Sequence, residues 1–103
     1  RQDLWPAISG IVTHYGEQAI RDLICSYDWS CDEALRVVYC ESRFQPGVVS
    51  PDGRNWGLFQ VNLVHLARVG GDTTALLDPA TNVRVAYDIY RDAGGWRPWS
   101  CKP

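Results

Sequence analysis

The chain has 103 residues, of which 46% are apolar and 21% charged, and its formal net charge at pH 7 is −2. This length favours one domain with a modest core, and no apolar run approaches the roughly 20 residues of a membrane-spanning helix. The ten basic residues are scattered without a basic run, so we expect neither nucleic acid binding nor membrane insertion. We expect residues 1–103 to form a single domain and the protein to be a monomer.

Four cysteines in so short a chain favour an oxidising compartment and two disulfides. The cysteines and the two histidines show no C-x2-C or H-x3-H spacing, so we expect no metal and no cofactor. Four cysteines allow three pairings, and their positions alone leave all three open. The first residues, RQDLWP, lack a charged-then-apolar leader, so we expect any signal peptide to be absent from this sequence.

The first third of the chain predicts three helices. Apolar residues at 7, 8, 11, 12 and 15 form a helical stripe that Gly16 is expected to end. Residues 17–29 repeat the stripe. Its buried face is expected to comprise Ala19, Ile20, Leu23, Ile24 and Tyr27.

The third helix, over residues 31–42, has the clearest start. Ser30 is a good N-cap, and Glu33 completes an S-x-x-E capping box. The stripe predicts a buried face, and Pro46-Gly47 closes the segment. That face is expected to include Leu35, Val38 and Tyr39.

From residue 48 to residue 62 the apolar residues no longer follow the helical period. A Pro-Asp-Gly-Arg-Asn turn between short apolar segments predicts a small hairpin or irregular sheet here. Asn62 is expected to cap a short helix over residues 63–69, and Asp78 to cap a last one that ends at Gly94. The inner face of this last helix is expected to comprise Val83, Ala86, Tyr87 and Tyr90. The tail GWRPWSCKP is too aromatic to be free. The chain is therefore predicted to be mainly α (α+β), with several helices and one small β element.

Glu41 is the chemically unusual glutamate. It is expected in the last turn of a helix, where the carbonyl ends already carry partial negative charge. Apolar neighbours such as Tyr39 and Phe44 would raise its pKa further, toward the range of a general acid. The alternative is a surface glutamate paired with Arg43 or another arginine.

The stretch SPDGRNWGLFQVN supplies hydroxyl and amide side chains among aromatic residues and glycines. Amides beside aromatic rings suit sugars, because the rings stack on apolar sugar faces and the amides bind hydroxyl and acetamido groups. A polar turn with a buried tryptophan is the alternative. The candidate substrate-binding residues here are Ser50, Asn55, Trp56, Gln60 and Asn62.

The segment ESRFQPGVVSPDGRNWGLFQVN resembles the signature of soluble lytic transglycosylases (SLT) and goose-type lysozymes. That signature combines Glu-Ser, a serine nine residues after the glutamate, and Gly-Leu-x-Gln-x-Asn. The segment LLDPATNVRVAYDIYRDAGGWRPWSC resembles the later part of small secreted members, so the resemblance covers residues 29–101. It implies a lysozyme-like fold in which the small β-hairpin element lines a cleft.

The resemblance also implies roles for individual residues. Glu41 would be the catalytic acid, Ser50 and Gln60 would line the cleft, and Asn82 would hold the architecture. Cys40–Cys101 is a familiar pair in such short members, which leaves Cys25–Cys31. The family's Ala-Tyr-Asn-Ala-Gly motif is absent, so Tyr87 and Tyr90 are candidates for its tyrosine, and position 55 has Asn where small relatives often have Asp.

The resemblance implies a secreted or cell-wall-associated enzyme that cleaves the β-1,4 bond between N-acetylmuramic acid and N-acetylglucosamine in peptidoglycan glycan strands. A lytic transglycosylase reaction is favoured because a second carboxylate is hard to find in the sequence, although folding could bring Asp72 or Asp78 to the cleft. The alternatives are a hydrolytic lysozyme (muramidase) with a second carboxylate, a non-catalytic wall-binding module, or a small disulfide-stapled interaction domain.

Overall fold

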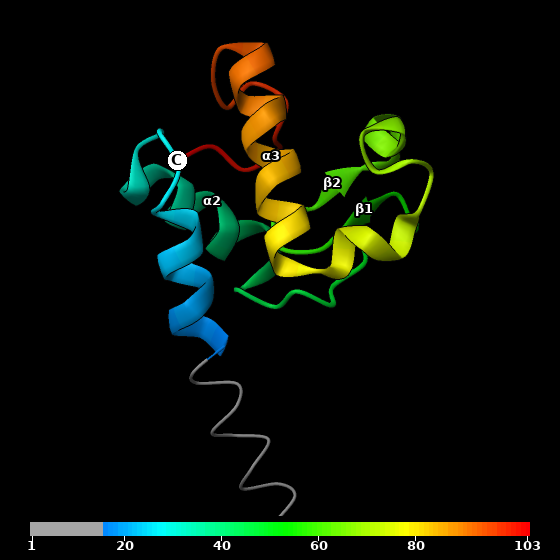
Figure 1. Cartoon of the computed structure of the whole chain (residues 1–103), viewed down its shortest axis with the longest axis horizontal. Helices are drawn as coiled ribbons and strands as arrows, with labels where there is room; N and C mark the ends of the chain where they lie inside the picture. Colours follow the sequence, from blue (N-terminus) through cyan, green and yellow to red (C-terminus); the bar gives the residue numbers. More distant parts are fainter. Residues whose placement is uncertain (1–15) are drawn as a thin grey trace, which may run out of the picture.

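The computed structural model describes residues 16–103, and the fold is mainly helical with one two-stranded antiparallel sheet. Figure 1 shows this arrangement in chain order. The elements after the helical segment 16–24 are helix α2 (Cys31–Ser42), strands β1 (Asn55–Trp56) and β2 (Val61–Asn62), the 3₁₀ helices η1 (Leu63–Val69) and η2 (Thr73–Leu77), and helix α3 (Pro79–Ala93). The predicted fold class is confirmed. No helix within residues 16–103 is long and apolar enough to cross a membrane.

The first predicted helix, up to Gly16, lies outside the described residues apart from Gly16 itself. Gly16 is helical and continuous with residues 17–24, so the prediction that it ends a helix is wrong. The next predicted helix ends at Ile24 rather than near residue 29, because the chain turns there to begin α2. The turn is held by the Cys25–Cys31 disulfide and by the Trp29 indole, which donates to the Ile24 carbonyl at 2.7 Å. Ala19, expected on the buried face, is exposed.

Helix α2 begins at the predicted cap but with a different role for Glu33. The Ser30 hydroxyl oxygen accepts a hydrogen bond from the Glu33 amide at 3.2 Å, as predicted. The Glu33 carboxylate does not return to the cap, because it accepts from the Trp96 indole at 2.9 Å. The predicted burial of Tyr39 is also wrong. Its side chain is 51% exposed, and the buried face is centred on Val37 and Val38.

The predicted irregular sheet is present, with two consecutive reversals. The Pro-Asp-Gly-Arg-Asn turn makes the first reversal, and Val49 and Trp56 on its two sides pair in an isolated antiparallel bridge. A second turn, over residues 57–60, then pairs β1 with β2. The last two predicted caps are confirmed, because Asn62 caps η1 and Asp78 caps α3. The short helix η2 has no counterpart among the predicted elements.

Asn82 joins α3 to this sheet. Its side chain is fully buried and makes three hydrogen bonds to backbone groups. Its carbonyl oxygen accepts from the Phe59 amide at 2.8 Å, and its amide donates to the carbonyls of Trp56 and Leu76 at 2.9 and 2.8 Å. The second turn therefore has a fixed position relative to α3, in agreement with the architectural role that the resemblance implied.

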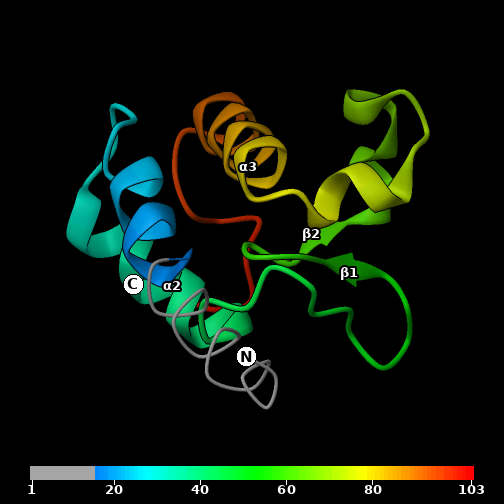
Figure 2. The ribbon, with the colours of Figure 1, turned by 60° about the horizontal axis from the view of Figure 1, so that its bottom comes forward.

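The C-terminal tail folds back onto the body, as its aromatic content predicts. Trp96 and Trp99 are buried, and the Trp99 indole donates to the Phe59 carbonyl at 3.0 Å. The tail ends at the Cys40–Cys101 disulfide, so both disulfides are the pairs that the resemblance implied. In Figures 1 and 2 the tail, drawn in red, runs from the end of α3 to the side of α2.

Candidate active site

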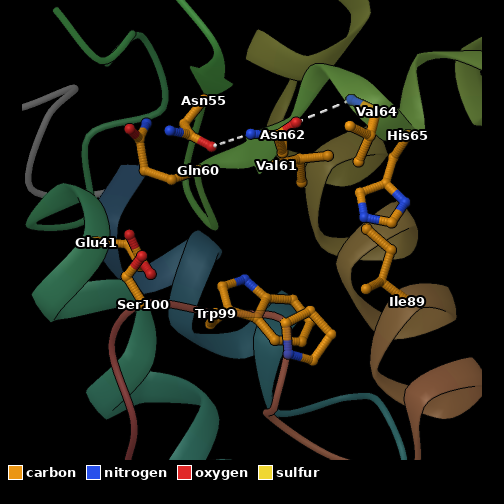
Figure 3. A pocket seen from close by; sticks show the side chains of 11 residues that line it. Glu41, Asn55, Gln60, Val61, Asn62, Val64, His65, Ile89, Trp99 and Ser100 are labelled. Carbon is orange, nitrogen blue, oxygen red and sulfur yellow. Dashed lines mark hydrogen bonds between the residues drawn. The ribbon is translucent and has the colours of Figure 1, made fainter. Parts of the chain in front are cut away.

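A cleft of about 500 Å³ opens between the end of α2, the hairpin, η1, α3 and the tail. Figure 3 shows Glu41 on one side of it, with the hairpin amides and the η1 residues across from it. Its wall contains both polar and apolar side chains. The lining residues are Glu41, Asn55, Gln60, Val61, Asn62, Val64, His65, Ile89, Pro98, Trp99 and Ser100.

Glu41 is the last residue but one of α2 and is half-buried. Its removal from water raises the pKa of this carboxyl above the ordinary value of 4.5. Two weaker effects lower the same pKa, namely the hydrogen bond from the Cys101 amide at 3.2 Å and the positive charge of Lys102. The expected last-turn position is confirmed, and the pKa is raised by burial as expected. The apolar neighbours expected to enclose the carboxyl, Tyr39 and Phe44, do not line this cleft, so that part of the expectation is wrong.

The alternative of a surface ion pair does not hold within residues 16–103, where no arginine lies within salt-bridge distance of Glu41. Arg43 turns to the other side of the helix. Its guanidinium donates to the Tyr39 hydroxyl at 2.8 Å and lies over the Tyr39 ring at 4.6 Å. Glu41 is therefore a carboxyl without a neutralising arginine, at the edge of an open cleft.

Gln60 presents an acceptor to the cleft. Its backbone has a positive φ of 48°, at the end of the tight second turn. Its side-chain amide donates to the carbonyls of Val48 and Gly57 at 3.1 and 3.0 Å. These two acceptors fix which end of the amide is nitrogen, since the reverse orientation would oppose oxygen to oxygen. The amide oxygen is left for a ligand.

Asn55 and Asn62 face each other across the β1–β2 ladder. The Asn62 side chain donates to the Asn55 side-chain oxygen at 3.1 Å, and its own oxygen accepts from the Val64 amide at 3.0 Å. Both side chains are thereby held at the cleft wall, each with an amide hydrogen still to donate. The structure thus brings Glu41 together with three of the predicted substrate-binding residues.

Ser50 and Trp56 do not line the cleft. The Ser50 hydroxyl donates to Asp52 at 2.6 Å and accepts from the Asn55 backbone amide at 3.0 Å, so it organises the turn that places Asn55. The Trp56 indole donates to the Gly53 carbonyl at 2.8 Å, and its ring packs on the core. The expectation that these two side chains lie in the cleft is corrected.

Tyr87 and Tyr90 are also placed elsewhere. Both rings pack around Trp29, with centroids at 5.4 and 5.5 Å, in the aromatic cluster that joins α3 to the tail. The residue of α3 that lines the cleft is Ile89, and successive helical residues differ by about 100° in direction. Neither tyrosine is therefore in position to act as the family's motif tyrosine.

His65 is a polar cleft residue that no sequence motif singled out. Burial, with a smaller contribution from the charge of Arg68, lowers the pKa of its imidazole below 6.5. The Arg68 guanidinium donates to its Nδ1 at 3.3 Å, so the neutral ring has its proton on Nε2. The sequence did hold a hint of this position, because His65 lies three residues after Asn62 on a helix that begins at the edge of the sheet.

No acidic residue other than Glu41 lines the cleft within residues 16–103. Asp52 lies exposed in the first turn, where hydrogen bonds from Ser50 and the Arg54 amide lower the pKa of its carboxyl. Asp72 and Asp78 are N-caps of η2 and α3. The described residues also contain no group of three His, Cys, Asp or Glu side chains placed to hold a metal ion.

The family described as "Lysozyme like domain" matches residues 29–101 of this chain. The match spans more than half of the chain and includes Glu41, the hairpin, α3 and the tail. The chain therefore belongs to the lysozyme-like domain family, and this membership indicates, in general terms, a glycosidase that acts on peptidoglycan. No curated protein and no solved structure gives a significant match.

Proposed function

We propose that this protein cleaves the β-1,4 bond between N-acetylmuramic acid and N-acetylglucosamine in peptidoglycan, with Glu41 as general acid and then general base. Family membership supports the substrate class. The half-buried Glu41 carboxyl, whose pKa is raised by burial, supports the acid role, because it retains its proton to higher pH than an ordinary glutamate. Lysozyme itself is the well-known case of a glutamate whose pKa is raised in this way, and the same physical reasoning applies to Glu41.

The reaction begins when the Glu41 carboxyl donates its proton to the oxygen that links the two sugars. The C1–O bond breaks, the proton stays with the departing sugar, and positive charge develops at C1 of the muramic acid residue. The Glu41 carboxylate then accepts the proton of that residue's 6-hydroxyl, whose oxygen bonds to C1. The products are a sugar with a new free hydroxyl and a 1,6-anhydro end, without net consumption of water.

One observation carries the choice of this reaction over hydrolysis. A hydrolase ordinarily needs a second carboxylate about 5–9.5 Å from the first, to act as nucleophile or to activate water. Among the cleft-lining residues Glu41 is the one carboxylate, and Asn55, at the position where small relatives often have Asp, is an amide. An amide cannot act as a base at neutral pH, so Glu41 has to perform both proton transfers.

Mass spectrometry of the muropeptides released from purified bacterial walls tests this proposal. We expect soluble products with 1,6-anhydro ends. Products heavier by one water, with reducing ends, would show hydrolysis and would contradict the single-carboxylate mechanism. Binding to walls without any soluble product would instead indicate a non-catalytic wall-binding module.

The finer family assignment is part of the same proposal. We infer a small secreted form of the soluble lytic transglycosylase and goose-type lysozyme group, with residues 1–103 as one domain acting as a monomer at the cell wall. Two disulfides fit an extracellular protein. The quoted signature around Glu41 and the Trp-x-x-Trp-Ser-Cys tail support the small form.

Gln60→Ala is expected to lower the cleavage rate by about tenfold or more, because it removes an acceptor at the cleft wall that orients the substrate. It also frees the Val48 and Gly57 carbonyls, so we expect a loss of about 1–2 kcal/mol in the free energy of unfolding. Turbidity loss of wall suspensions and urea denaturation measure the two effects. Gln45→Ala, an exposed glutamine on the preceding loop, is the matched control. An unchanged rate in the folded Gln60→Ala variant would give Gln60 a structural role alone.

A further inference from the structure

The C-terminal tail reaches the candidate acid through a single residue. The Cys101 backbone amide donates a hydrogen bond to Glu41 Oε2 at 3.2 Å, and the Cys101 side chain forms the disulfide with Cys40. One tail residue therefore contacts two consecutive residues of α2. Figure 3 shows Ser100, the residue before it, on the same side of the cleft as Glu41. The tail residues that line the cleft are Pro98, Trp99 and Ser100.

The tail has little freedom to move this amide. The Trp96 indole donates to the Glu33 carboxylate on α2 at 2.9 Å, and the Trp99 indole donates to the Phe59 carbonyl in the hairpin at 3.0 Å. The disulfide to α2 is a third attachment. A donor that is already in place when charge develops stabilises that charge without a cost of reorganisation.

The hydrogen bond makes the two carboxyl oxygens of Glu41 different. Oε2 accepts from the Cys101 amide, whereas no protein hydrogen bond within residues 16–103 engages Oε1. An N–H group donates best to an oxygen that carries no proton, so the proton of the neutral carboxyl belongs on Oε1. When this proton leaves, negative charge spreads over both oxygens. The hydrogen bond then becomes charge-assisted, which makes it about twice as strong.

We propose that Cys101 is a positioning residue of the catalytic site, whose amide, held in place by the disulfide to Cys40, makes Glu41 Oε1 the oxygen that transfers the proton in both steps. The inference rests on the proposed function for the reaction itself. In the first step the Oε1–H bond breaks, the proton bonds to the oxygen that links the sugars, and the amide stabilises the carboxylate that is left. In the second step Oε1 accepts the proton of the 6-hydroxyl, and the carboxyl is neutral again.

Few charges face Glu41 besides this amide. Burial is the largest effect on the pKa of Glu41 and raises it, while the Cys101 hydrogen bond and then the charge of Lys102 lower it. On η1, His65 is neutral at pH 7, because burial lowers the pKa of its imidazole. The hairpin and α3 present uncharged side chains to the cleft, namely Asn55, Gln60, Val61, Asn62 and Ile89. Loss of the amide hydrogen should therefore raise the pKa of Glu41 further.

The test removes this hydrogen without changing a side chain. The cysteines at 25, 31 and 40 allow the chain to be assembled by chemical ligation. At position 101 the α-hydroxy acid analogue of cysteine replaces the amide by an ester, which keeps the disulfide and has no N–H. An ester in place of the Lys102 amide is the matched control, since that amide donates no backbone hydrogen bond within residues 16–103.

We expect the ester at position 101 to raise the pKa of Glu41, measured by carbon NMR titration of its isotope-labelled carboxyl. It should lower kcat for wall cleavage by about tenfold or more with KM little changed, because the amide contacts Glu41 and not the sugars. The basic limb of the pH–rate profile should move to higher pH, since Glu41 keeps its proton longer. The ester at position 102 should match the all-amide protein in all three measurements.

A pair of double variants tests the disulfide. Cys40→Ser with Cys101→Ser keeps the amide but frees the end of the tail, so we expect a loss of kcat in the folded protein. Cys25→Ser with Cys31→Ser removes the other disulfide, which lies at the start of α2 and does not line the cleft, and should retain kcat. Circular dichroism checks folding. Equal kcat values in the two double variants would overturn the part assigned to the Cys40–Cys101 bond.

Two results with the esters would overturn the inference. The first is an unchanged pKa of Glu41 or an unchanged kcat with the ester at position 101. The second is an equal loss with both esters, which would indicate a general effect of the ester group. Either result, in a protein that still cleaves walls, leaves the proposed function standing. An all-amide protein that cleaves no wall would instead overturn the proposed function, and this inference with it.

Discussion

Glu41→Gln is expected to abolish nearly all wall cleavage while leaving the fold intact. A glutamine side chain has almost the same shape and can still accept the Cys101 amide hydrogen bond through its oxygen, but it has no proton to transfer at neutral pH. General acid–base catalysis contributes about 10²–10⁴-fold for one positioned group, and here one group is proposed for both steps. Turbidity loss of wall suspensions, with circular dichroism as the check on folding, measures the outcome.

Glu17→Gln is the matched control for this variant. Glu17 is an exposed glutamate whose partner is Arg21, on the helical segment before α2, and its replacement should leave the cleavage rate unchanged. Wall lysis by the Glu41→Gln protein at near the unmodified rate would remove Glu41 from the mechanism.

Glu41→Gln is also expected to change the free energy of unfolding, by an amount that depends on pH. The folded-state pKa of Glu41 is raised above 4.5, so ionisation is less favourable in the folded chain than in the unfolded one. This penalty is fully present above the raised folded pKa and vanishes below about 4.5, where the carboxyl is protonated in both states. Glu41→Gln should therefore be slightly more stable than the unmodified protein at pH 7 and equal to it in this respect at pH 3. Urea denaturation at the two pH values measures the difference.

Asn82→Ala is expected to cost about 3–5 kcal/mol of the free energy of unfolding, the largest stability effect among these variants. It removes three hydrogen bonds and leaves the Phe59 amide and the carbonyls of Trp56 and Leu76 buried without these bonds. Gly57 lies against the same side chain, since a Cβ added there would come within 2.4 Å of the Asn82 amide nitrogen. The Asn82 side chain therefore fits closely against this turn in the folded protein.

Arg84→Ala is the control for Asn82→Ala, because Arg84 is two residues away on the exposed face of α3 and pairs with Asp88 at 3.7 Å. Its replacement should change the free energy of unfolding by no more than about 0.5 kcal/mol. Urea denaturation followed by tryptophan fluorescence measures both. A loss of less than about 1 kcal/mol for Asn82→Ala would show that these bonds exchange with water at little cost.

Local chemistry was sufficient to predict several features of this protein. Ser30, Asn62 and Asp78 cap helical elements at the predicted positions, because an N-cap depends on one side chain and the amides next to it in the chain. Glu41 in the last turn of α2 followed from the start and stop of a single helix. The disulfide pairs and the lysozyme-like fold came from the resemblance, which the family match over residues 29–101 supports.

Only the tertiary structure decided which predicted polar and aromatic residues meet at the cleft. Asn55, Gln60 and Asn62 face Glu41, whereas Tyr87 and Tyr90 pack around Trp29, since the direction of α3 is set by Asn82 and by the aromatic core rather than by its own stripe. His65 and Ser100 reach the cleft from segments 24 and 59 residues after Glu41 in the chain. Such meetings depend on packing between distant segments, which no local periodicity encodes.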